Sequence, residues 1–126
     1  MNRAKISFIL FITLFIIQAA HSQELINFES PDQLPEPQGG YDSLNSWIKT
    51  HMIWTWGQAT VLGNVFITAR IDTSGTLTDI KIVRGLTEET NQEALRLARK
   101  MPPWVPAEDN GKKVNWPVII TIRFEK

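Results

Sequence analysis

The chain has 126 residues, with 13 basic and 13 acidic side chains and no cysteine. This length suits one small domain. The lack of cysteine excludes disulfides, thiolate metal sites, a cysteine nucleophile and lipidation on a cysteine. A formal net charge of zero does not suggest nucleic acid or an anionic membrane surface as the partner.

Residues 1–22 have the pattern of a secretory signal peptide. Arg3 and Lys5 form a basic start, residues 6–17 are almost entirely apolar, and small residues precede a cleavage site before Gln23. Cleavage would remove both basic residues and leave 11 basic against 13 acidic side chains, a formal charge of −2. An uncleaved membrane anchor is the alternative, but the apolar run is shorter than the roughly 20 residues that span a bilayer. We therefore expect cleavage and export.

The exported part divides into a lead-in, residues 23–41, and a domain, residues 42–126. The lead-in contains several prolines and glycines and few apolar residues, so we expect no core of its own.

The first predicted helix begins at Asp42 or Ser43, because either side chain can cap it. Its apolar stripe has the spacing of one helix face and consists of Leu44, Trp47, Ile48, His51 and Met52. Trp54 extends this stripe, and Gly57 is the predicted terminator.

Two strands should follow as a hairpin. Residues 65–71 alternate between apolar and mostly polar side chains, and residues 72–75, Asp-Thr-Ser-Gly, have turn chemistry. Residues 77–84 form the second strand. We expect the two strands to pair antiparallel.

A second helix and a last strand complete the domain. Thr90 and Glu93 fit a capping box at the start of this helix, and Pro102 ends it. The last strand, residues 116–124, places apolar side chains on one face. Residues 118–122 carry no charge, although natural edge strands are usually blunted by charge or proline.

The order helix, strand, strand, helix, strand predicts an α+β fold, a three-stranded antiparallel sheet with two helices packed on one face. The crossover through the second helix places the first strand in the centre and the last strand at an edge. Such an open apolar edge is either an aggregation hazard or a docking site.

The sequence from residue 63 to residue 124 resembles the carboxy-terminal domain of TonB, and the likeness extends over roughly residues 35–126. The motifs that carry it are Asp72 to Gly75, Ile80 to Arg84, Glu93 to Arg96, the run MPPWVPA at residues 101–107, and Gly111 to Val114. The resemblance implies the same three-stranded sheet and a periplasmic location. It also implies that an extended segment of a TonB-dependent outer-membrane receptor, or of another periplasmic protein, adds as a strand beside the last strand.

The resemblance implies a partner-binding site in two segments. These are Val114, Asn115, Val118, Ile119, Ile120, Thr121, Ile122, Arg123 and Phe124, together with Thr55, Trp56, Gly57 and Gln58. Arg123 is suited to pair with an acidic residue of the incoming segment. Thr55 and Trp56 stand where family members carry a Tyr-Pro pair, so the second contact differs from the family pattern.

Energy-transducing members of the family carry a long proline-rich spacer. Here the 15 residues from Gln23 to Pro37 reach only about 50 Å when fully extended. An adaptor or a competitor of a transducer therefore fits this reach better than a transducer does.

We expect neither an enzyme nor a bound metal or cofactor. His51 is the only histidine after residue 22 and is interpreted as a side chain at the edge of the core. Asp72 and Asp79 flank a hairpin, where turn capping is the ordinary role. The sequence offers no clustered metal ligands, no Ser-His-Asp set and no glycine-rich phosphate loop.

Two alternatives from other classes remain. Trp54 and Trp56 either seal the base of the core or form an exposed aromatic patch that would bind envelope glycan. The open edge strand could instead pair with a second copy and form a homodimer.

Overall fold

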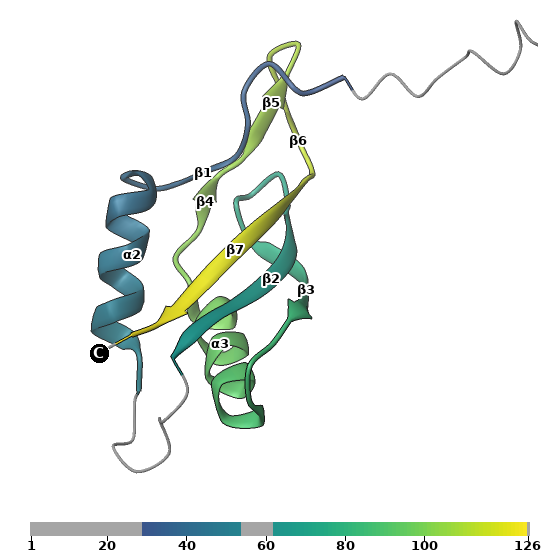
Figure 1. Ribbon diagram of the computed structural model, residues 1–126. Coiled ribbons are helices and arrows are strands. Elements are labelled where there is room, and N and C mark those ends of the chain that lie inside the picture. Colours follow the sequence, from purple (N-terminus) through teal and green to yellow (C-terminus); the bar gives the residue numbers. More distant parts are fainter. Residues whose placement is uncertain (1–28, 54–61, 126) are drawn as a thin grey trace, which may run out of the picture.

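The computed structural model of the chain describes residues 29–53 and 62–125. Its elements are β1 (Glu36–Pro37), α2 (Gly40–His51), β2 (Gly63–Ile71), β3 (Leu77–Arg84), α3 (Glu88–Lys100), β4 (Trp104–Val105), β5 (Ala107–Asp109), β6 (Lys112–Val114) and β7 (Trp116–Phe124). The long strands form an antiparallel sheet in the order β3-β2-β7 (Figure 1). The predicted fold class, central strand and edge strand are confirmed.

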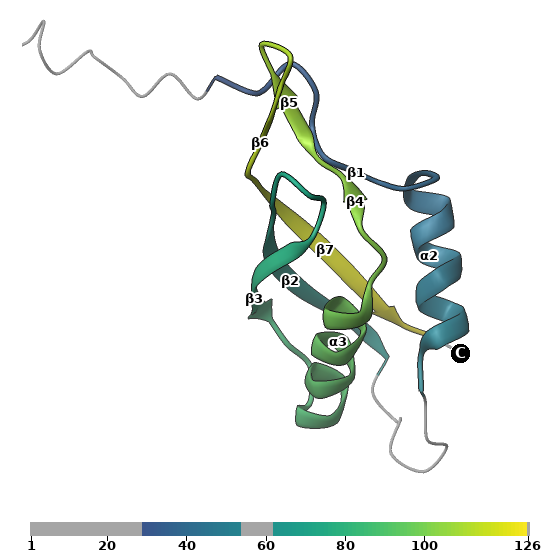
Figure 2. The same cartoon turned by 180° about the vertical axis from the view of Figure 1, so that it is seen from behind.

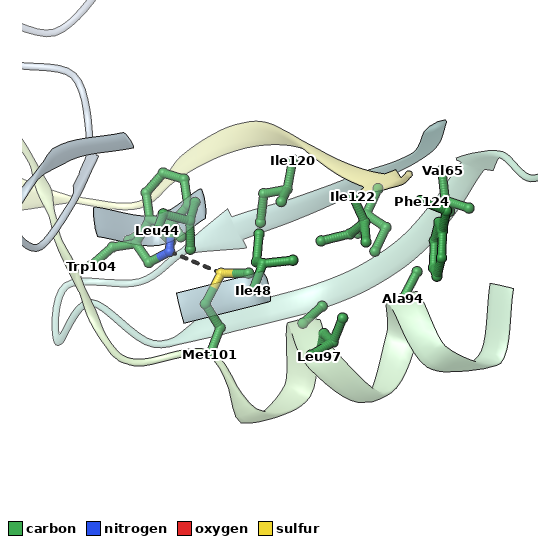
Figure 3. Packing of buried hydrophobic residues seen from close by; sticks show 13 residues of the cluster. Leu44, Ile48, Val65, Ala94, Leu97, Met101, Trp104, Ile120, Ile122 and Phe124 are labelled. Carbon is green, nitrogen blue, oxygen red and sulfur yellow. Dashed lines mark hydrogen bonds between the residues drawn. The ribbon is translucent and has the colours of Figure 1, made fainter. Parts of the chain in front are cut away.

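One core joins the sheet to both helices. The inward side chains of β2 and β7 are buried, since alternate residues of a strand share a face. Helix α3 lies behind the sheet in Figure 1 and in front of it in Figure 2, whereas α2 flanks the sheet on the β7 side. Figure 3 shows the shared cluster, which includes Leu44, Ile48, Val65, Ile67, Ile71, Ala94, Leu97, Met101, Trp104, Ile120, Ile122 and Phe124.

Helix α2 begins before either predicted cap. Its N-cap is Gly39, with φ 78° and no side-chain cap bond, so the prediction of Asp42 or Ser43 as the cap is wrong. Gly39 and Gly40 both have positive φ, which glycine adopts without steric cost, and they turn the chain directly into the helix. Asp42 lies in the first turn instead, where the helix dipole favours an acid.

Helix α3 also begins one turn earlier than predicted. Thr87 is the N-cap, and its hydroxyl accepts a hydrogen bond from the Thr90 amide at 3.2 Å. The Thr90 hydroxyl in turn accepts from the Thr87 amide at 3.0 Å. The capping box is therefore Thr87–Thr90, and the predicted Thr90–Glu93 box is wrong.

Glu93 has a long-range role instead. Its carboxylate accepts from the Ile53 amide at 2.7 Å and from Arg96 Nη2 at 2.9 Å. Arg96 Nη2 also donates to the His51 carbonyl at 2.8 Å. Glu93 and Arg96 thus tie α3 to the carboxyl end of α2. The Glu93 carboxylate raises the pKa of Arg96.

The lead-in is docked on the domain over its described residues. β1 pairs antiparallel with β4, and the backbones of Gln33 and Glu108 exchange two hydrogen bonds of 3.0 Å each. The Asp32 carboxylate accepts from the Asn110 amide at 2.8 Å, at the turn between β5 and β6. The lead-in therefore holds this hairpin against the domain, although its sequence indicates no core of its own.

Candidate partner-binding edge

One edge of the sheet is unpaired among the described residues. β7 pairs with β2 along its whole length, from Trp116 opposite Ile71 to Phe124 opposite Gly63, without a register shift. No strand of the described part pairs with the other side of β7. This edge can accept a further strand.

The position of Pro117 shows which backbone N–H and C=O groups of β7 point away from β2. Pro117 lies opposite Arg70. The Thr78 hydroxyl of β3 donates to the Arg70 carbonyl at 3.3 Å, so this carbonyl is directed toward β3 and not toward β7. Arg70 and Pro117 therefore form a non-hydrogen-bonded pair of the ladder, and the backbone of Pro117 is directed to the open edge. A proline at that position removes no ladder bond.

The alternation then identifies which backbone groups a new strand would meet. In an antiparallel ladder every second residue directs both its N–H and its C=O to the same side. Ile119, Thr121 and Arg123 share the direction of Pro117. Together they offer three N–H and four C=O groups at the open edge, because Pro117 contributes only its C=O.

A groove of about 280 Å³ runs beside this edge, between β7 and α2. Its lining residues are Tyr41, Leu44, Asn45, Ile48 and Lys49 from α2, Trp104, and Ile119, Ile120, Thr121, Arg123 and Glu125 from β7 and its end. The wall formed by α2 combines apolar side chains (Tyr41, Leu44, Ile48) with the exposed polar side chains of Asn45 and Lys49. The edge therefore opens into a groove that has room for the side chains of an added strand.

Trp104 supports the inner end of the groove. Its side chain is 1% exposed, and its ring Nε1 donates to Met101 Sδ at 3.3 Å (Figure 3). Tyr41, 57% exposed, meets the Trp104 ring edge-on with a centroid distance of 6.1 Å. The Trp104 amide donates to the Gly75 carbonyl at 2.8 Å, so the turn between β2 and β3 holds Trp104 in place.

Charged side chains lie at the other end of the groove. Lys49 Nζ lies 3.7 Å from the Glu125 carboxylate, and both side chains are well exposed. An exposed pair of this kind adds little stability, since water and salt screen it. An incoming segment can therefore displace it at small cost.

Residues 58–125 match the family described as Gram-negative bacterial TonB protein C-terminal. The match covers more than half of the 126 residues. The chain belongs to this family. None of the curated proteins and none of the solved structures matches the chain significantly.

Membership in the TonB C-terminal family makes the chain a TonB-like interaction module, because the family is a non-catalytic interaction domain of the cell envelope. Among residues 29–53 and 62–125 the structure contains no helix that is long and apolar enough to cross a membrane. The predicted signal peptide, residues 1–22, lies outside the described residues.

The structure divides the predicted binding residues into several groups. Val114 belongs to β6, where it pairs with Ala107, and Asn115 joins β6 to β7, so neither is part of the edge strand. Ile119, Thr121 and Arg123 have exposed side chains and outward-directed backbones.

The remaining strand residues are inward-facing. Ile120, Ile122 and Phe124 are buried in the core, and Val118 packs against it. Thr55, Trp56, Gly57 and Gln58 lie outside the described residues, as does Trp54. His51 is exposed and stacks on Trp47 with a centroid distance of 4.3 Å.

The helical wall of the groove was not among the predicted binding residues. Tyr41, Asn45 and Lys49 line the groove from α2, although Tyr41 lies in the predicted lead-in and Asn45 and Lys49 lie in no predicted site. Tyr41 precedes Leu44 by three residues and Ile48 by seven, which is the spacing of one helix face. That signal identifies Tyr41 as part of the apolar stripe once the helix is known to start at Gly40.

Proposed function

We propose that the chain is a periplasmic protein-binding module that takes up an extended segment of a TonB-dependent outer-membrane receptor as an added strand along β7. The observation that carries this proposal is the row of backbone groups at Pro117, Ile119, Thr121 and Arg123, which faces an open groove. Strand addition obtains affinity from main-chain hydrogen bonds and selectivity from alternate side chains. Receptor binding would link the chain to transport across the outer membrane.

The groove sets the length and pattern of the segment. Residues 117–123 extend over about 20 Å at the rise of a strand, so a segment of about seven residues covers them. Side chains on one face of the segment would lie against Tyr41 and Ile48 and should be apolar. Those on the other face would lie beside Ile119 and Arg123, where an acidic residue is favoured by the Arg123 charge.

An NMR titration with synthetic peptides from the periplasmic segments of outer-membrane receptors tests strand addition. We expect saturable amide shifts concentrated in residues 117–124. Peptides N-methylated at successive positions sharpen the test, because only alternate peptide amides face β7. Methylation of an amide that faces β7 should weaken binding about tenfold or more per site, whereas methylation of an amide that faces away should have little effect. Equal effects at the two alternate sets of positions would rule out strand addition.

A pair of variants at one position gives the matching test on the protein. Thr121→Pro removes an outward N–H but no bond to β2, as Pro117 does in the native strand. Thr121→Val keeps this N–H and has a similar volume. We expect Thr121→Pro to abolish peptide binding, with β2 amide shifts preserved, and Thr121→Val to bind. Peptide binding by a folded Thr121→Pro variant would contradict the proposed edge.

Self-association would compete for the same edge, because Ile119 is 68% exposed there. Sedimentation velocity over a range of concentrations distinguishes a strand-paired homodimer from a monomer. If the chain dimerises through β7, Thr121→Pro should return it to a monomer. The glycan alternative at Trp54 and Trp56 stays a prediction, which replacement of both by alanine in a glycan-retention assay tests.

A further inference from the structure

On the second face of the sheet, opposite α3, the residues that lie in register carry charges of one sign. Directly opposed residues share a face, so the register assigns this open face to Asn64, Phe66, Thr68, Arg70, Thr78, Lys81, Arg84, Pro117, Ile119, Thr121 and Arg123. It is the face toward the viewer in Figure 1. Four of these side chains are cations and none is a carboxylate.

The cations are distributed evenly. Successive rungs of the ladder are Thr78–Arg70–Pro117, Lys81–Thr68–Ile119, Arg84–Phe66–Thr121 and Asn64–Arg123, so each rung holds one cation. Rungs on one face repeat about every 7 Å and strands lie about 5 Å apart. The cations therefore cover a strip about 20 Å long and 10 Å wide.

None of these cations lies directly opposite an acid in the register of the sheet. Among the described residues none of the four side chains forms an ion pair or hydrogen bond. In the β5–β6 hairpin, by contrast, each cation lies directly opposite an acid, Lys113 opposite Glu108 and Lys112 opposite Asp109, although neither pair is within ion-pair distance. The one acid of β3, Asp79, has φ 50° and lies at a register shift, outside the opposed pairs.

Exposed apolar side chains lie among the cations. Ile119 is 68% exposed, and Phe66 in the middle of the strip is half-buried. A surface that combines cations with protruding apolar groups fits the boundary between lipid headgroups and acyl chains. An ordinary solvated surface mixes charges of both signs, as the hairpin does.

We propose that this cationic face binds the surface of an anionic phospholipid bilayer. Each cation contacts headgroup phosphates, and Ile119 inserts at their boundary. The net charge of zero does not reveal this surface, because a sum over the chain does not record where charges lie. The face shares Ile119, Thr121 and Arg123 with the groove on the α2 side of β7, but Arg70, Lys81 and Arg84 do not line the groove, so a bound strand leaves these three cations accessible.

Binding of the full chain to vesicles tests the proposal. The probes are phosphatidylcholine vesicles with and without about one-third phosphatidylglycerol. Each cation near an anionic surface contributes about a fivefold gain in affinity, so Lys81→Gln with Arg84→Gln should weaken binding about thirtyfold. The matched control, Lys112→Gln with Lys113→Gln, removes the same charge from a hairpin in which each cation lies opposite an acid. It should change binding at most a few-fold.

Every variant keeps residues 1–28 unchanged, so the difference between the two pairs reports the sheet face alone. Higher salt should reduce this difference, because the Debye length shortens. The proposal would be overturned if the two double variants lost vesicle affinity equally, or if binding were the same with and without phosphatidylglycerol. An acidic protein would then be the candidate partner. Lys81 and Arg84 lie on β3, away from the β7 edge, so their replacement should leave peptide binding unchanged.

Discussion

Gly75 lies where the turn between β2 and β3 meets the backbone of Trp104, and Gly75→Ala should be strongly destabilising. Gly75 has φ 86°, and a Cβ there would lie 2.0 Å from the Trp104 carbonyl oxygen. An L-residue in this left-handed region costs about 1–2 kcal/mol. The clash would also displace Trp104 and break the bond from its amide to the Gly75 carbonyl, which contributes about 1 kcal/mol. We expect a total loss of about 3 kcal/mol.

Gly111→Ala is the matched control. Gly111 has φ 75°, but a Cβ there would meet no atom within 4 Å. It therefore carries only the backbone cost of about 1–2 kcal/mol. Urea unfolding followed by circular dichroism measures both variants. If the two losses agree within about 0.5 kcal/mol, the close approach to Trp104 contributes nothing and the reasoning is wrong. Because Trp104 lines the groove, Gly75→Ala should also weaken peptide binding, and Gly111→Ala should not.

Three further predictions concern local interactions. Ser74 and Thr76 donate to the Asp72 carboxylate and lower its pKa from 3.8, so this stabilisation is present above about pH 4 and is lost as the pH falls through the folded-state pKa. Thermal unfolding should therefore show a smaller loss of stability on acidification for Asp72→Asn than for the native chain. Thr87→Ala should cost about 1 kcal/mol in urea unfolding, through loss of the α3 cap. Arg96→Met and Glu93→Gln should be non-additive in a double-mutant cycle, since the two side chains form one network; additive losses would contradict it.

The sheet could be predicted from the sequence because burial of one face makes apolar residues recur at every second position of a strand. The predicted bounds of β7, residues 116–124, are those observed, and its alternation correctly places Ile120 and Ile122 in the core. The order of elements was enough to place β7 at an edge. These features depend on residues close together in the sequence and on general rules of connection.

The caps and the groove could not be predicted in the same way. Thr87–Thr90 and Thr90–Glu93 have the same spacing, so the local pattern does not distinguish them. The structure does, because Glu93 is engaged by Ile53, 40 residues earlier in the chain. The groove likewise depends on how far α2 lies from β7, a tertiary distance that no local pattern encodes.

The outward direction of the β7 backbone could have been predicted from Pro117. Proline in a strand occupies positions where no ladder N–H is needed, and the alternation then extends to Ile119 and Thr121. The sequence interpretation used the missing charge of this segment but not its proline. It therefore placed β7 at the edge of the sheet but did not predict which of its backbone groups face outward.

The residues of β7 contribute in turn to three surfaces: the core, the open edge and the cationic face. Its even-numbered side chains fill the core, while the backbones of Ile119, Thr121 and Arg123 face the open edge and their side chains lie on the cationic face. A side-chain change at one of these three residues therefore affects both proposed surfaces at once. Peptide N-methylation perturbs only the edge, and substitution of Lys81 and Arg84 perturbs only the face. The two surfaces act independently if N-methylation of the peptide abolishes peptide binding and if vesicle binding weakens when Lys81 and Arg84 are replaced.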